Sequence, residues 1–168
     1  IPGVKVFMGS STGNMLVDKK NELEKIFKEA ERINMPVAVH CEESSIIAAN
    51  TKAIKEQEGD DPDVRFHPVI RSEEACYRST ASAVELAEKF GTRLHVMHIS
   101  TAKELELLTA GKPENKKITA EVTPAHLTFC DADYATLGTK IKCNPAIKSS
   151  DDREALRKAI SEGKIDLI

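Results

Sequence analysis

Three residues that can take part in metal chemistry lie within or at the end of short apolar runs. Lys5 lies in Val-Lys-Val-Phe-Met, His40 ends Val-Ala-Val-His, and His98 lies near the end of Leu-His-Val-Met-His-Ile. Histidine is a frequent zinc ligand. A lysine ammonium has no lone pair for a metal, but a neutral lysine amine that captures CO2 becomes a carbamate with two oxygens. Together, the three residues point to a metal site.

Each of these residues, and each ionisable neighbour, also has a structural interpretation. A single strand-end histidine is often a hydrogen-bonded core residue, and Lys5 is also of the type that protects an edge strand from aggregation. His95 and His98 are three residues apart, so strand alternation places them on opposite faces, and we expect His98 to face the site. Cys41 is expected to be a buried thiol. We expect His67 to be exposed on a loop.

Short apolar segments alternate with longer helical ones along the chain. Strands are expected over residues 3–8, 35–41, 93–99, 118–123, 140–144 and 164–168. Helices are expected over residues 18–33, 44–58, 72–90, 101–110 and 150–161, and residues 59–71 form the main irregular loop. This alternation is typical of an α/β protein with a parallel sheet, in which sites form at the carboxyl ends of the strands.

The number of strands predicts a partial (β/α)8 barrel. A complete barrel needs roughly 250 residues, whereas this chain has 168. It begins without Met and ends in an apolar run, so we expect a single barrel segment, residues 1–168, truncated at both ends. A doubly wound open sheet is the alternative, but no Gly-rich phosphate loop follows a predicted strand.

The composition argues against several classes of partner. The net charge is −3, there is no Trp, and basic residues do not cluster, which disfavours nucleic acid and anionic membranes. No apolar run of about 20 residues is present. The four cysteines form no CxxC pair and are expected to be reduced thiols of a cytoplasmic protein. We expect a homo-oligomer that acts on a small-molecule substrate.

Several segments resemble one enzyme family. They are Val-Lys-Val-Phe-Met-Gly-Ser-Ser-Thr-Gly-Asn at 4–14, Val-Ala-Val-His-Cys-Glu at 37–42 and Leu-His-Val-Met-His-Ile-Ser-Thr at 94–101. Residues 119–127 and 142–148 are similar to later segments of the same family. The ordered set resembles the cyclic-amide branch of the amidohydrolase superfamily, and within it the dihydroorotases. The resemblance runs the whole length of the chain.

The resemblance implies a (β/α)8 barrel, of which this chain covers about strands four to eight, with one or two zinc ions. Lys5 matches the carboxylated lysine that bridges the metals of the family. His40 and His98 match its two single-histidine ligands. The histidine pair of strand one is absent, and the Asp of strand eight lies beyond Ile168, so the resemblance implies that this chain alone is inactive.

The resemblance also implies residues that act on the substrate. Asn144 matches a residue that contacts the substrate ring, and Thr12 falls where some members have a loop threonine that touches the substrate. Glu121 and His126 lie near the site of the family in supporting positions. Lys148 stands where many members have Arg, which is a departure from the family pattern.

The implied reaction is the reversible hydrolysis of L-dihydroorotate to N-carbamoyl-L-aspartate in pyrimidine biosynthesis. The related dihydropyrimidinases, hydantoinases and allantoinases use the same metal set on other rings and remain alternatives. An inactive homologue that serves as a scaffold is an alternative of a different class. A plain α/β segment without a site would leave a buried Lys5 unexplained.

Overall fold

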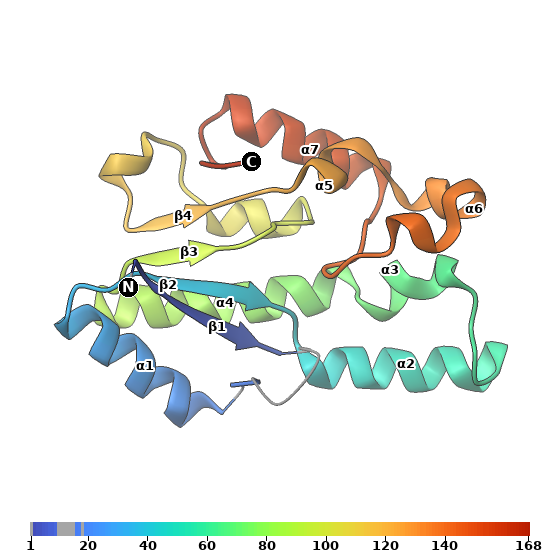
Figure 1. Ribbon diagram of the computed structural model, residues 1–168, viewed down its shortest axis with the longest axis horizontal. Helices are drawn as coiled ribbons and strands as arrows, with labels where there is room; N and C mark the ends of the chain where they lie inside the picture. Colours follow the sequence, from blue (N-terminus) through green and yellow to red (C-terminus); the bar gives the residue numbers. More distant parts are fainter. Residues whose placement is uncertain (1, 10–15, 18) are drawn as a thin grey trace.

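Four short parallel strands form the sheet of this protein in a computed structural model that describes residues 2–9, 16–17 and 19–168. The strands are β1 (Val4–Met8), β2 (Val37–Cys41), β3 (Leu94–Val96) and β4 (Ile118–Ala120). They lie side by side in chain order, β1-β2-β3-β4 (Figure 1). This order has no reversal among the described strands, so it does not support a doubly wound sheet. The prediction of an α/β fold with a parallel sheet is confirmed.

The two faces of the sheet differ in polarity because successive side chains of a strand point to opposite sides. The strand register aligns one row on the apolar face: Val6, Val39, Val96 and Ala120. It aligns another row on the opposite face: Lys5, Ala38, His95 and Thr119. The first row is buried, while the second row is half-buried or exposed. The chemistry-bearing side chains therefore share the second face.

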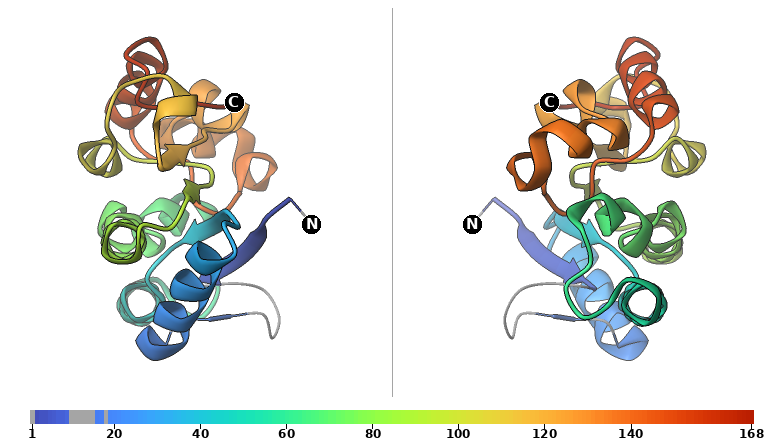
Figure 2. Two further views of the ribbon diagram at one scale, coloured as in Figure 1. Left: turned by 90° about the vertical axis from the view of Figure 1, so that its left-hand side faces the viewer. Right: turned by 90° about the vertical axis from the view of Figure 1, so that its right-hand side faces the viewer.

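Helices cover the apolar face. The long helices are α1 (Lys20–Arg32), α2 (Ser44–Glu58), α4 (Glu73–Phe90) and α7 (Ser150–Ser161). Side chains of α1, α4 and α7, among them Phe27, Ala83 and Leu156, form one core with the apolar strand row. Figure 2 shows α4 on the side of the sheet away from the N-terminus. Fully burying one such large apolar side chain contributes roughly 1.5–3 kcal/mol.

Short helical segments complete the chain. They are α3 (His67–Ile70), α5 (Pro124–Thr128), α6 (Tyr134–Leu137) and the 3-10 turns η1 (Val64–Phe66), η2 (Lys103–Leu107), η3 (Pro113–Asn115), η4 (Asp131–Asp133) and η5 (Gly138–Ile141). Within the described part of the chain, no helix is long and apolar enough to cross a membrane.

Two of the six predicted strands do not form. The segment expected over 140–144 lies partly in η5. It is followed directly by Pro145, which has no N–H for a strand ladder. The segment expected over 164–168 does reach the edge of β4, where Leu167 makes one isolated parallel bridge with Glu121. The Asp166 carboxylate accepts the hydrogen bond of the Ala120 N–H there, so the ladder between this segment and β4 does not continue.

Two helical predictions also need correction. Residues 101–110 form only the short turn η2, because the buried Glu104 carboxylate accepts the Thr101 hydroxyl and the Ser100 N–H and so holds the chain in a tight turn. The predicted loop 59–71 contains η1 and α3. The other predicted helices form, although the proposed cap Asp18 lies outside the described residues.

Gly9 allows the end of β1 to approach the end of β2 closely. Its φ of +95° is a conformation that L side chains rarely adopt. A Cβ on Gly9 would lie 1.6 Å from the carbonyl oxygen of Glu42. A side chain at residue 9 would therefore push apart the two strand ends that carry the polar face.

Replacing this glycine should destabilise the protein more than replacing one in open space. Gly59 has a similar φ of +93°, and no described atom lies within 4 Å of the Cβ that alanine would add. Gly59→Ala should therefore cost only the backbone strain, about 1–3 kcal/mol. Gly9→Ala should cost a further 1–3 kcal/mol or so from overpacking. Urea unfolding measures both losses, and equal losses would contradict the close approach.

Candidate active site

His40 and His98 lie together at the carboxyl ends of two neighbouring strands. His40 is the next-to-last residue of β2, and His98 follows the end of β3 by two residues. His40 Nδ1 lies 3.1 Å from His98 Nε2, and the two rings meet edge to face at 74°. Two ring nitrogens that point at each other at this distance form a natural pair of ligands for one cation.

The prediction that His95 and His98 lie on opposite faces is wrong. β3 ends at Val96, and His98 has a positive φ of 42°, so strand alternation no longer holds at residue 98. His95 is in the same row as Lys5, and its ring contacts the Thr119 hydroxyl at 2.9 Å. Both histidines therefore serve the polar face.

Lys5 lies on the polar face but is exposed, contrary to the expectation that its apolar neighbours bury it. β1 is the edge strand of the described sheet, and Lys5 is exposed there. The ammonium lies 4.8 Å from the centre of the Phe7 ring, and that ring lies 6.1 Å from the ring of His40. One side chain, that of Phe7, thus lies between Lys5 and the histidine pair. The interpretation of Lys5 as a lysine that protects an edge strand also fits this position.

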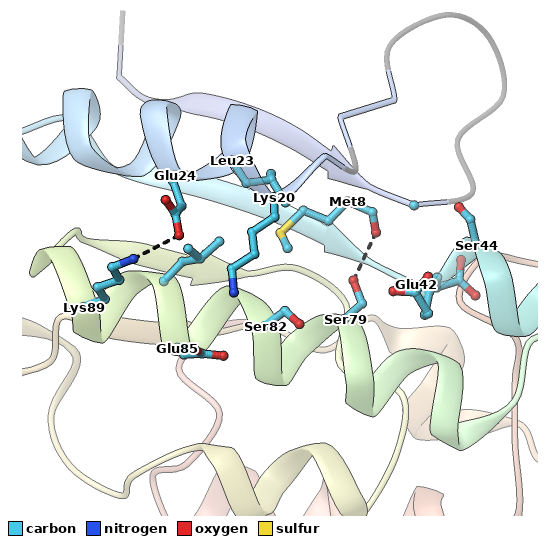
Figure 3. A pocket seen from close by; sticks show the side chains of 13 residues that line it. Met8, Lys20, Leu23, Glu24, Glu42, Ser44, Ser79, Ser82, Glu85 and Lys89 are labelled. Atoms are coloured by element: carbon cyan, nitrogen blue, oxygen red, sulfur yellow. Dashed lines mark hydrogen bonds and ion pairs between the residues drawn. The ribbon is translucent and has the colours of Figure 1, made fainter.

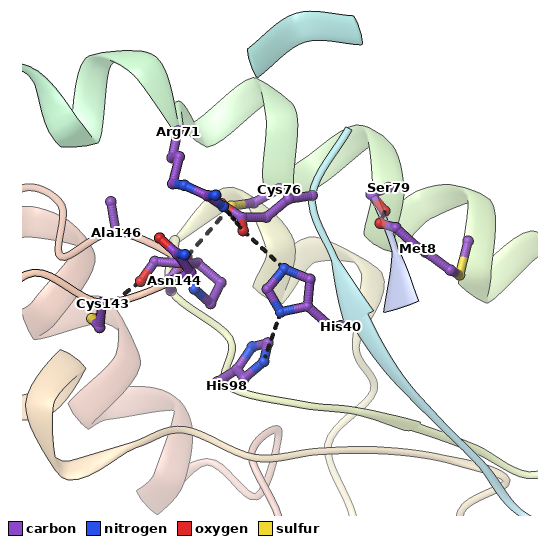
Figure 4. Close-up of polar contacts among 12 residues, drawn as sticks. Met8, His40, Arg71, Cys76, Ser79, His98, Cys143, Asn144 and Ala146 are labelled. Atoms are coloured by element: carbon purple, nitrogen blue, oxygen red, sulfur yellow. Dashed lines mark hydrogen bonds and ion pairs between the residues drawn. The ribbon is translucent and has the colours of Figure 1, made fainter. Parts of the chain in front are cut away.

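A buried carboxylate orients His40. Glu42 is fully buried, and its Oε2 accepts a hydrogen bond from His40 Nε2 at 2.9 Å. The guanidinium of Arg71 contacts the same oxygen. Figure 4 shows the contacts that run from Arg71 to His40 and on to His98. Because Nε2–H of His40 is donated to Glu42, its Nδ1 is the acceptor in the contact with His98 Nε2.

The charge state of His98 suits a ligand. Burial, followed by the nearby His40 and Lys5, lowers the pKa of His98 to about 3, so its ring is neutral at pH 7. His98 Nδ1 is buried and has no hydrogen-bond partner among the described residues. A neutral ring with one opposed nitrogen matches the donor chemistry that zinc prefers.

Two histidines alone do not hold a metal ion firmly. Among the described residues, no group of three or more His, Cys, Asp or Glu side chains is arranged to hold one. Cys41 is buried, and it points to the apolar face, away from His40, as predicted. The histidine pair is therefore not by itself a complete metal site among the described residues.

His67 lies beside Asn144, and the expectation that His67 is exposed is wrong. His67 is buried, and its Nε2 lies 2.9 Å from the carbonyl oxygen of Cys143 and 3.1 Å from Oδ1 of Asn144. Burial is the main cause that lowers the pKa of His67, so the ring is neutral. Thr12, the other residue expected to touch a substrate, lies outside the described residues.

Glu121 and His126 have partners of their own. Glu121 Oε2 lies 3.2 Å from His95 Nε2. This pair therefore lies on the polar face, in the part of the sheet formed by β3 and β4. His126 lies 2.7 Å from the Thr123 hydroxyl through Nδ1 and 3.1 Å from the Pro145 carbonyl through Nε2. Both ring nitrogens of His126 are thus engaged, and the residue anchors the segment that carries Asn144.

Lys148 belongs to a buried polar network that no local sequence pattern indicates. Its ammonium donates to Ser100 Oγ at 3.1 Å and to the Ala146 carbonyl at 3.2 Å, and it lies 3.5 Å from Cys76 Sγ. Burial raises the pKa of the Cys76 thiol to about 12, so the thiol stays protonated. This network fixes the segment after Asn144 against α4.

A separate cavity of about 230 Å³ lies on the helix-covered side of the sheet, between α1 and α4 (Figure 3). Its rim holds the ion pair of Lys89 with Glu24 at 2.9 Å, and Ser79 donates to the Met8 carbonyl in its wall. Glu42 lines this cavity as well and so separates it from the histidine pair.

Comparison with curated proteins finds dihydroorotases. The chain is 35% identical over 145 residues to the dihydroorotase of Halalkalibacterium halodurans, which covers 84% of this chain and 32% of that protein. It is 31% identical over 170 residues to that of Staphylococcus epidermidis, which covers 100% of this chain and 38% of that protein. The chain thus spans about a third of the length of these relatives. No protein-family model matches.

Comparison with solved structures finds hydantoinases. An L-hydantoinase (dihydropyrimidinase) from Arthrobacter aurescens is 26% identical with a TM-score of 0.86, over 97% of this chain and 36% of that one. A D-hydantoinase (dihydropyrimidinase) from Thermus sp. is 20% identical with a TM-score of 0.84, over 99% of this chain and 37% of that one. These findings confirm the resemblance of this chain to the dihydroorotases, within a fold that it shares with the hydantoinases.

Proposed function

We propose that this chain is part of the barrel of a zinc-dependent dihydroorotase, which interconverts L-dihydroorotate and N-carbamoyl-L-aspartate in pyrimidine biosynthesis. The observation that carries the proposal is the pair of opposed nitrogens, His40 Nδ1 and His98 Nε2, with Glu42 on the far nitrogen of His40. The dihydroorotases among its relatives, at 31–42% identity, support the choice of substrate. The complete protein is proposed to be a cytoplasmic homo-oligomer.

In this proposal His40, His98 and Lys5 hold one or two zinc ions. Lys5 ligates as a carbamate, because its ammonium has no lone pair. Its place on the same face of the sheet as the histidines supports this role. Zinc, when bound, supplies a Lewis acid for the ring amide carbonyl and lowers the pKa of water.

The other residues of this chain bind and position. Asn144 orients the substrate ring, and Thr12, which follows β1 in the sequence, touches the substrate. Glu121 supports the site through His95, and His126 supports it by holding the Asn144 segment. An Asp from the eighth strand of the barrel, beyond this chain, takes the proton from the attacking water and passes it to the leaving ring nitrogen. This segment alone is therefore inactive.

Hydantoinase or dihydropyrimidinase activity is the second candidate. It is favoured by the solved structures that share the fold, which carry those names. An inactive scaffold is the candidate of a different class, and the retention of Lys5, His40 and His98 on one side of the sheet argues against it.

The histidine pair should bind the metal. In the complete protein, His40→Ala or His98→Ala should remove most of the bound zinc, because each change deletes one of two opposed ligands. His67→Ala is the matched control, since His67 is also a buried histidine but contacts the Cys143 carbonyl and not the histidine pair, and it should keep its zinc. Elemental analysis gives the stoichiometry. Wild-type zinc in both ligand variants would rule out the assignment.

Lys5 should act only in its carboxylated form. Lys5→Ala should abolish activity, and acetate or propionate should partly restore it by filling the vacated space with a carboxylate. Lys5→Arg should be as inactive, because a guanidinium neither captures CO2 nor ligates a metal ion. Mass measurement of the active protein should find an added carboxyl group on Lys5. Wild-type turnover by Lys5→Arg would make Lys5 an ordinary edge-strand lysine.

Dihydroorotate should be the preferred ring. The complete enzyme should open dihydroorotate far faster than dihydrouracil, hydantoin or allantoin, because only dihydroorotate carries a ring carboxylate for the polar groups of the site to bind. A steady-state comparison of kcat/KM decides the question. A preference for dihydrouracil or hydantoin would move the proposal to the dihydropyrimidinases and hydantoinases.

A further inference from the structure

The helical turn α3 and the residue after it contact both the histidine pair, through Glu42, and the proposed substrate residue Asn144. α3 spans His67–Ile70, and Arg71 follows it at its end, with its backbone N–H donated to the carbonyl of His67 at 2.9 Å. Residues four apart on a helical turn face the same way. His67 and Arg71 accordingly both point inward, one toward Asn144 and the other toward Glu42.

Arg71 acts on the metal side through Glu42. A fully buried carboxylate is costly unless a cation or several donors compensate it. The Arg71 side chain is largely buried and contacts Oε2 of Glu42, the same oxygen that accepts from His40 Nε2. Arg71 thereby holds Glu42 in the position that fixes the tautomer of His40 and directs its Nδ1 at His98.

His67 acts on the substrate side through Asn144. The Cys143 carbonyl can only accept, so Nε2 of His67 carries the proton and is shared between that carbonyl and Oδ1 of Asn144. With Oδ1 held in this way, the amide N–H groups of Asn144 are left to donate. The residue is therefore set to bind an acceptor oxygen, such as the carbonyl or carboxylate of a cyclic amide.

We propose that His67 and Arg71 are positioning residues of one helical turn, through which α3 sets the metal ligand His40 and the substrate-binding Asn144 together. The inference rests on the proposed function, because it assigns Asn144 to the substrate and His40 to the metal. A packing role for α3 alone would affect only stability. The positioning role affects zinc affinity and KM, and it divides these two effects between two residues.

The Arg71 arm is tested on zinc affinity of the complete, metal-free protein, measured by competition with a chelating dye. Arg71→Met should weaken zinc binding about tenfold, the low end of what loss of a ligand's direct partner costs, because Arg71 acts through Glu42. Arg71→Lys should recover part of the loss by keeping the charge. Arg65→Met is the matched control on η1, because Arg65 is exposed and pairs with Asp63, and it should bind zinc like the wild type.

The His67 arm is tested on steady-state kinetics of the zinc-loaded protein. His67→Leu should raise KM for dihydroorotate about tenfold with zinc content unchanged, since one hydrogen bond that orients Asn144 is lost. His67→Gln, which keeps an N–H donor, should recover part of the loss. Val69→Ala is the control on the same turn, because Val69 is 51% exposed, and it should keep the wild-type KM.

The outcomes separate the inference from the proposed function. Wild-type zinc affinity in Arg71→Met, or wild-type KM in His67→Leu, overturns the inference. Equal losses in both readouts for every variant, without rescue by Lys or Gln, assign α3 a packing role and also overturn it. A wild type that binds zinc but does not open dihydroorotate defeats the proposed substrate, while the zinc arm still decides the role of Arg71.

Discussion

The site depends on a single buried charge. Glu42 is fully buried at the carboxyl end of β2, and removing a carboxylate from water costs several kcal/mol unless partners compensate it. The guanidinium of Arg71 and the ring of His40 meet this need at one oxygen. These contacts bring α3 against the strand ends and fix the His40 tautomer. They thereby determine that His40 Nδ1 faces His98.

The parallel sheet explains why these groups meet. Parallel strands end at the same edge, and their side chains alternate between two faces. One face is apolar and lies under α1, α4 and α7, so it supplies the stability. The other face is then free to carry ionisable groups, and the ends of β2 and β3 bring His40 and His98 within hydrogen-bond distance. Gly9 lets the end of β1 join this edge without steric conflict.

The sequence predicts the parts of the site that lie on regular elements. His40 and His98 could be found because each ends a short apolar run, and strand ends of a parallel sheet converge. The prediction that Lys5 is buried was wrong, since apolar flanking residues do not reveal that β1 is an edge strand. The placement of His95 was wrong as well, because the alternation rule stops where β3 ends, and nothing in the sequence marks that early end.

The residues that connect the site could not be predicted from spacing. Arg71 and His67 lie in a segment rich in Gly, Asp and Pro that reads as an irregular loop, and their partners are 29 and 77 residues away in the chain. Only Glu42 could have been noticed, because it follows the strand-end His40 by two residues and so lies within reach of its ring. Long-range pairing of this kind comes from tertiary packing, which local patterns do not encode.

The most direct test is a crystal structure of the complete, zinc-loaded protein with anomalous scattering at the zinc edge. The account predicts a zinc peak shared by His40 Nδ1 and His98 Nε2, with Glu42 still bonded to His40 Nε2 and an added carboxyl group on Lys5. A zinc peak elsewhere, or the two histidines still bonded only to each other in a protein that binds zinc, would contradict it.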